Sequence, residues 1–285
     1  MHKDTYNSKT LTVGIWFMLA ATAALMVANL VVRPPLNWLR LIPVYTLAAF
    51  TLLHGFTFFG IRRTLWFLAL GLVVSYVAEY LGTNFGAIFG THWFSRVRDL
   101  RLPVGVMLPG RVPLAVVLTW YGMLYATFLT AVFLVKARPS EPSPFATVPI
   151  AAGMLMALWQ LTAGPVAVAW GLMGFVNKGF YHSVPLSSFV GWSVTTMFIL
   201  LFFMAVEPEA ANTDRFHARI SSRPIPFLPL VMFGLQLLYG TVTCFLLGFN
   251  GAAWLGTLVL VLYLLAIAVS NRKTVPDLKP AENIA

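Results

Sequence analysis

The sequence predicts an all-α fold, a polytopic integral membrane helical bundle with about eight transmembrane helices. Of the 285 residues, 59% are hydrophobic and 10% are charged, whereas a soluble domain usually carries about 25% charged residues. Apolar runs of the roughly 17–25 residues that a helix needs to cross the hydrocarbon recur along the whole chain. A water-soluble core could not hide this much apolar surface, so the bilayer must act as the solvent.

Eight apolar segments are long enough to span the bilayer, and short polar or proline-containing breaks separate them. They are Leu11–Val32, Leu39–Phe59, Thr64–Gly90, Val112–Val135, Val148–Ala169, Ser188–Val206, Leu228–Leu247 and Ala252–Val269. The third is so long that we expect its end to leave the hydrocarbon or to unwind. We expect a single transmembrane domain over residues 1–285, with a short polar N-terminus at 1–10 and a disordered tail at 271–285.

The formal net charge of +10 does not indicate nucleic-acid binding, because the basic residues are scattered between apolar runs rather than gathered on one face. With eight spans, 12 of the 19 Lys and Arg residues fall on the side of the two termini and 7 on the other. Positive residues concentrate on the cytoplasmic side. Both termini are therefore predicted to be cytoplasmic. We expect the membrane to be the cytoplasmic membrane of a bacterium or archaeon, and the basic loops to attract membrane lipids.

One acidic residue, Glu79, stands inside an apolar span. A carboxyl group at membrane depth is costly and marks a functional site by default. Gly82, Gly86 and Gly90 follow on the same helix face, and glycines spaced by four allow another backbone or a flat ligand to approach closely. Glu79 is therefore the first candidate for a site.

The alternative for this region is structural: tight helix packing, with Glu79 paired to an arginine such as Arg96 or Arg111. Two loops rich in aromatic and polar residues bear on the choice, one over Phe89–Leu114 and one over Asn177–Trp192. Such residues suit a membrane interface, but they also suit the wall of a pocket, since aromatic faces stabilise cations. Both loops follow odd-numbered spans, so either orientation puts them on the same membrane face.

Other candidates carry less weight. His54 is a candidate ligand or proton relay; the alternative is that it hydrogen-bonds a neighbouring helix. His92 and His182 lack a carboxylate-rich motif with metal-ligand spacing, so no metal is predicted. The lone Cys244 excludes an internal disulfide and a cysteine cluster. No phosphate-binding glycine loop or nucleophile elbow is present, and no cofactor is predicted.

Three stretches, in this order, resemble the membrane carotenoid-biosynthesis family: Glu79–Gly86, Pro109–Leu114 with Trp120, and Tyr181–Trp192. That family includes the carotenoid 1,2-hydratases of the bisanhydrobacterioruberin hydratase type. The resemblance implies a carotenoid hydratase-like lyase that adds water to the terminal double bond of an acyclic carotenoid or related isoprenoid end group.

The resemblance also implies roles for individual residues. Glu79, kept protonated by an apolar pocket, would protonate the double bond, and His182 or His92 would position the water or remove its proton. Aromatic faces would stabilise the carbocation. The implied substrate-binding residues are Gly82, Gly86, Trp93, Arg111, Trp120, Tyr181 and Trp192.

The chain departs from the family pattern at one place. The family has aspartates in the stretch 159–165, where this chain has Gln160 and Gly164. A divergent member with another substrate, or with no catalysis, is therefore an alternative. So are a non-catalytic membrane protein that binds a polyene or prenyl lipid, and a small transporter, although the sequence shows no convincing internal repeat of the kind transporters carry. The sequence leaves the oligomeric state open.

Overall fold

Eight long helices make up most of the part of the chain that the structure describes, and the predicted fold class is confirmed. The structure is a computed structural model that describes residues 8–32, 37–95, 106–135, 144–208 and 225–272. The long helices are α1 (Ser8–Val31), α2 (Asn37–Phe58), α3 (Ile61–Phe85), α4 (Leu114–Leu134), α5 (Pro144–Ala169), α6 (Leu186–Val206), α8 (Leu228–Leu246) and α9 (Asn250–Arg272). Each contains a span long and apolar enough to cross a membrane. The expected disordered tail lies outside the described residues, apart from the end of α9.

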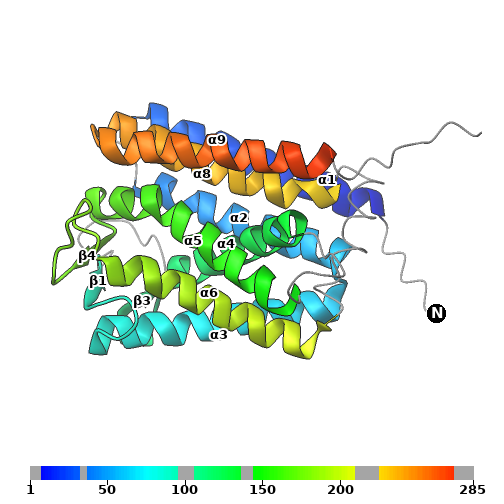
Figure 1. The fold of residues 1–285 in the computed structure, drawn as a ribbon, viewed down its shortest axis with the longest axis horizontal. Coiled ribbons are helices and arrows are strands. Elements are labelled where there is room, and N and C mark those ends of the chain that lie inside the picture. Colours follow the sequence, from blue (N-terminus) through cyan, green and yellow to red (C-terminus); the bar gives the residue numbers. More distant parts are fainter. Residues whose placement is uncertain (1–7, 33–36, 96–105, 136–143, 209–224, 273–285) are drawn as a thin grey trace, which may run out of the picture.

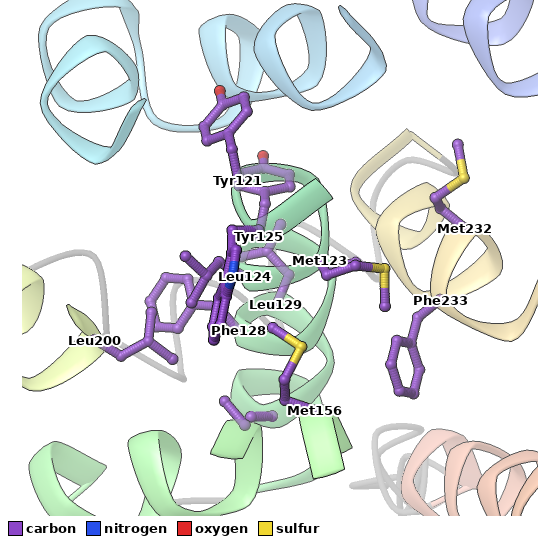
Figure 2. Packing of buried hydrophobic residues seen from close by; sticks show 14 of the residues in the cluster. Tyr121, Met123, Leu124, Tyr125, Phe128, Leu129, Met156, Leu200, Met232 and Phe233 are labelled. Atoms are coloured by element: carbon purple, nitrogen blue, oxygen red, sulfur yellow. The ribbon is translucent and has the colours of Figure 1, made fainter. Parts of the chain in front are cut away.

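Helix α4 forms the centre of the bundle and contacts α2, α3, α5 and α8 (Figure 1). Every residue from Trp120 to Phe133 is buried. Figure 2 shows Tyr121 and Tyr125 on one side of α4, and Met123 on the side facing Phe233 of α8. A helix that is apolar all round belongs inside a bundle, whereas the outer helices expose large apolar side chains, as contact with lipid requires.

Helix α3 ends at Phe85, five residues before the end of the predicted span. Gly86 caps it in the left-handed conformation, with φ of 70°, and its backbone N–H bonds the carbonyl of Gly82. Glycine adopts this conformation without steric cost. The expectation that the end of this span unwinds is thereby confirmed, and the chain is free to fold back toward Glu79.

Two short antiparallel ladders, which the sequence did not predict, lie at the end of the bundle where α3 ends (Figure 1). Strand β1 (His92–Phe94) pairs with β4 (Met173–Phe175), and β2 (Met107–Leu108) pairs with β3 (Val112–Pro113) around the 3-10 turn η2 (Pro109–Arg111). The first ladder joins the segment after α3 to the segment after α5. It satisfies backbone groups that would be costly to leave unpaired in or near a bilayer.

His54 on α2 is buried and hydrogen-bonds a neighbouring helix, which was the second of the two alternatives for this residue. Its Nε2 lies 2.9 Å from the carbonyl oxygen of Ile225, and its Nδ1 lies 2.6 Å from the hydroxyl of Tyr125. A carbonyl can only accept, so Nε2 carries the hydrogen and Nδ1 accepts from Tyr125. The side chain therefore ties α2 to α4 and to the 3-10 turn η4 (Ile225–Phe227).

At the opposite end of the bundle, Glu207 follows α6 and pairs with two arginines at the start of α3. Its oxygens lie 2.7 Å from Nη2 of Arg62 and 2.8 Å from Nε of Arg63. This ion-paired cluster holds α3 and α6 together far from Glu79.

Helix α1 begins and α9 ends at the same end of the bundle (Figure 1), and the basic-residue asymmetry predicts that this end is cytoplasmic. Fusions after Ala285 test the orientation. A fluorescent protein that matures only in the cytoplasm should be active there, and alkaline phosphatase should be inactive. A matched pair of fusions after Lys178 should give the inverse pattern. Phosphatase activity at Ala285 would contradict the predicted orientation.

Candidate functional site

The carboxyl group of Glu79 is buried inside the bundle and bonded at both oxygens. The residue is 2% exposed. The indole Nε1–H of Trp120, on α4, donates to Oε1 at 2.8 Å, and Nε2 of His92, on β1, lies 3.0 Å from Oε2. Three elements thus meet at one acidic group. The structural alternative of a pairing with Arg111 does not apply, because Arg111 is exposed; Arg96 lies outside the described residues.

The hydrogen bonds of His92 fix where its protons can be. Its Nδ1 lies 2.9 Å from the carbonyl oxygen of Gly90, which can only accept, so Nδ1 carries a hydrogen. The contact between Nε2 and Glu79 then needs one more proton. Either the protonated Glu79 donates it to a neutral imidazole, or an imidazolium donates to the carboxylate. The pair therefore holds one transferable proton, with every other hydrogen bond satisfied in both states.

The environment favours protonation of His92, which lies outside the membrane-spanning segments. Burial acts to lower the pKa of the imidazole, but the hydrogen bond to Glu79, the charge of that group and the bond to the Gly90 carbonyl outweigh it. The pKa of His92 is therefore raised above its ordinary value.

Glycines make the room for this arrangement. A methyl group at Gly82 would lie 2.5 Å from Cε1 of His92, and one at Gly191 on α6 would lie 2.5 Å from Cδ1 of Phe89. The predicted glycine face on α3 is therefore filled by the side chains of the chain's own returning segment, with Phe89 packed between α3 and α6. Gly86 serves as the helix cap.

The pairing of β1 with β4 decides which aromatic residues point inward. His92 lies opposite Phe175 and Trp93 opposite Gly174. Because strand side chains alternate, His92 and Phe94 are buried while Trp93 is 50% exposed. Trp93, predicted to bind substrate, thus lies over Gly174 on the outer side of the ladder, and its neighbour Phe94 points inward instead.

A stack of indoles leads from Glu79 to a cavity. The rings of Trp120 and Trp192, on α6, are nearly parallel at 9°, with centroids 3.9 Å apart. Trp159, on α5, meets Trp192 edge to face at 5.7 Å. Trp192 and Trp159 line a cavity of about 180 Å³ together with Phe94 and Gln160. Glu79 and His92 are not among the residues that line it.

A second cavity of about 170 Å³ adjoins the first and shares Arg40, Thr119 and Trp159 with it. Each is smaller than the roughly 300–1,000 Å³ of pockets that enclose a whole drug-sized ligand. Each therefore has room for only part of a larger ligand.

The remaining predicted residues lie elsewhere. His182, with φ of 46°, packs against Phe249 at a ring separation of 4.5 Å, and no ring contact or hydrogen bond joins it to Glu79 or His92 in the described part of the chain. The hydroxyl of Tyr181 donates to the carbonyl of Leu161 at 2.8 Å. Burial raises the pKa of Tyr181 to about 12, so it stays a neutral donor.

Sequence reasoning missed Arg40, Phe94, Thr119 and Trp159, which line the cavities. One signal was available for Arg40: like Glu79, it is an ionisable residue inside a predicted span. Gln160, at a position where the resemblance implies an aspartate, is 4% exposed and lines the first cavity. A methyl group at Gly164 would lie 3.1 Å from Oε1 of Gln160, so the two departures from the family pattern are neighbours in space.

Comparison with known proteins gives one match. The family described as carotenoid biosynthesis protein matches residues 14–263, a range that contains Glu79, His92 and both cavities. No curated protein and no solved structure matches the chain.

Replacing Gly82 by alanine should disturb the site through His92. Alanine usually favours a helix by up to ~1 kcal/mol over glycine, but here the added carbon would lie 2.5 Å from the imidazole, and overpacking costs about 1–3 kcal/mol. The thermal unfolding midpoint in detergent should fall. Gly71→Ala is the matched control on α3, since its nearest contact would be an ordinary 3.6 Å. Equal stability of the two variants would show that His92 is not held against Gly82.

The raised pKa of His92 should make the stability depend on pH. A pKa raised by folding stabilises the protein fully below the unfolded value of about 6.5, and this stabilisation is lost as pH rises through the folded value. The unfolding midpoint should therefore fall as the pH rises above about 6.5. In Glu79→Gln the slope should flatten, because the charge that raises the pKa is gone. Identical slopes for the two proteins would refute the coupling.

Proposed function

The chain belongs to the carotenoid biosynthesis protein family, and from this premise we propose that it is an enzyme that hydrates the terminal double bond of an acyclic carotenoid or related isoprenoid end group. The observation that carries the proposal is the buried pair of Glu79 and His92, which holds one proton close to an apolar cavity walled by tryptophans.

The reaction needs a group that donates a proton to the alkene and recovers a proton at the end of each turnover. Protonation of the less substituted alkene carbon leaves a tertiary carbocation at the other alkene carbon. Water adds to this cationic carbon, and the resulting oxonium loses a proton. The product is a tertiary alcohol, and the proton lost from the oxonium restores the one delivered. In this proposal Glu79 delivers the proton, and His92, bonded to it at 3.0 Å, replenishes it.

The tryptophans supply the remaining chemistry. The face of an aromatic ring stabilises a cation, Trp most strongly. Trp192 and Trp159 both line the cavity, so an end group lying there rests against indole faces. Trp120 stacks behind Trp192 and bonds Glu79.

Delivery of the proton requires movement in this region. Contacts run from the cavity through Trp192 and Trp120 to Glu79, and neither Glu79 nor His92 lines the cavity. Entry of an end group must therefore displace the Trp192 ring far enough for the alkene to reach Glu79. The indole pair would then keep water from the proton until substrate arrives.

The same observation favours a second candidate, a non-catalytic protein that binds a polyene or prenyl lipid. Both oxygens of Glu79 are engaged in hydrogen bonds, and Gln160 and Gly164 stand where the family pattern has aspartates. In this case Glu79 would serve only to join α3, α4 and β1.

Glu79→Gln separates the two candidates. Glutamine can accept from Trp120 with its oxygen and donate to Nε2 of His92 with its amide, so the shape and hydrogen bonds survive while the transferable proton is lost. Hydration should fall by about 10²–10⁴-fold, the usual contribution of general acid catalysis. The measurement is pigment analysis, by mass spectrometry, of a host that accumulates acyclic carotenoids, with and without the chain.

Glu207→Gln is the matched control, because Glu207 is buried and pairs with arginines at the other end of the bundle. It should leave the pigment profile unchanged, with protein amounts compared by gel filtration in detergent. Full activity of Glu79→Gln would make Glu79 structural and defeat the mechanism. If the wild-type chain forms no product and Gln160→Asp creates it, the divergent, non-catalytic candidate is correct.

A further inference from the structure

Arg40 is a half-buried cation, and the described residues engage few of its hydrogen-bond donors. It stands near the start of α2, within the membrane span, and lines both cavities. Its Nη1 lies 3.4 Å from the carbonyl oxygen of Trp170, and the guanidinium lies 4.8 Å from the centroid of that ring. Its Nε is buried without a hydrogen-bond partner among the described residues.

No carboxylate in the described part of the chain balances this charge. Glu79 is bonded to Trp120 and His92, and Glu207 is paired with two arginines at the opposite end of the bundle. A charge at membrane depth is expensive unless it is paired or bonded. Among the described residues the charge of Arg40 therefore lacks a counter-ion, and a bound anion would supply one.

Two further polar side chains, Tyr239 and Gln236, face the second cavity. The hydroxyl of Tyr239 on α8 is buried and interacts with the side chain of Asn29, and its ring lies 6.3 Å from that of Trp170. Gln236, one turn earlier on α8, is 8% exposed, and within the described residues it makes no hydrogen bond. Both line the second cavity beside Arg40, and both can donate to an oxygen.

The rest of that cavity is apolar, with walls that include Met26, Leu47, Val166 and Ala167. A bare inorganic anion would leave these walls unfilled, and a hydrocarbon would leave Arg40 unpaired. We infer that the second cavity binds an amphipathic anion, with a phosphate head group held by Arg40, Tyr239 and Gln236 and an apolar chain along the walls. This inference rests on Arg40 and not on the Glu79–His92 pair, so it goes beyond the hydration chemistry.

Binding of radiolabelled farnesyl phosphate to the purified full chain, in an uncharged detergent, tests the inference. It should be saturable, and farnesol, the same chain without the anion, should compete at least about 10-fold less well. Arg40→Gln should weaken binding by about 10- to 100-fold, as loss of a charge-assisted bond does. Tyr239→Phe should weaken it by about 2- to 10-fold, as loss of a neutral hydrogen bond does.

Lys178→Gln is the matched control, since it removes a positive charge from an exposed position in the connection between β4 and α6. It should bind farnesyl phosphate as the wild-type chain does. An equal loss in Arg40→Gln and Lys178→Gln would show general attraction to basic residues and overturn the site. Equal competition by farnesol and farnesyl phosphate on the wild-type chain would overturn it without any variant.

Two further competitors identify the source of the head group. Displacement by dioleoyl phosphatidic acid, in preference to farnesyl phosphate, supports the site and indicates a bilayer lipid; the reverse preference supports it and indicates an isoprenoid. Inorganic phosphate that competes as well as either would overturn the amphipathic ligand. A wild-type chain that hydrates carotenoid but shows no saturable farnesyl phosphate binding refutes this inference and leaves the proposed function standing.

Discussion

The two hydrogen bonds to the Glu79 carboxyl group are the constraint on which the functional end of the molecule depends. In a bilayer an unbonded carboxyl group is costly, so the group must find donors within the bundle. It finds one on the central helix, at Trp120, and one on the segment that folds back after α3, at His92. These bonds fix the position of β1, and β1 in turn recruits β4 from the distant connection between α5 and α6.

Small residues and backbone pairing allow that arrangement to form. Gly86 lets α3 stop at membrane depth, Gly82 admits the imidazole, and Gly191 admits Phe89. The ladder between β1 and β4 satisfies the backbone of both segments, which would otherwise need water. The glycine face is therefore occupied by the protein itself. What remains for a ligand is the space on the other side of the indole stack.

That space has two polar features with different chemistry. On one side the stacked rings of Trp120 and Trp192 connect it to a group that holds a transferable proton. On the other, Arg40 presents a positive charge with no carboxylate partner among the described residues. Apolar walls join the two. In a low-dielectric interior the electrostatic interaction between a polar group and its neighbour is strong. A few side chains therefore suffice to give each end of the space a preference for a different ligand group.

The sequence by itself determined the eight spans and singled out Glu79, because span length and the cost of a buried carboxyl group are local properties of the chain. It also indicated that the two aromatic loops share one membrane face, because that follows from the number of spans. Only the tertiary structure decided that Glu79 bonds His92 rather than Arg111, that Phe94 points inward and Trp93 outward, and that Arg40 and Trp159 line the cavities. These outcomes depend on the register of a three-residue ladder between segments some 80 residues apart. A shift of one residue would exchange the two faces of that ladder, and nothing local in the chain specifies the register.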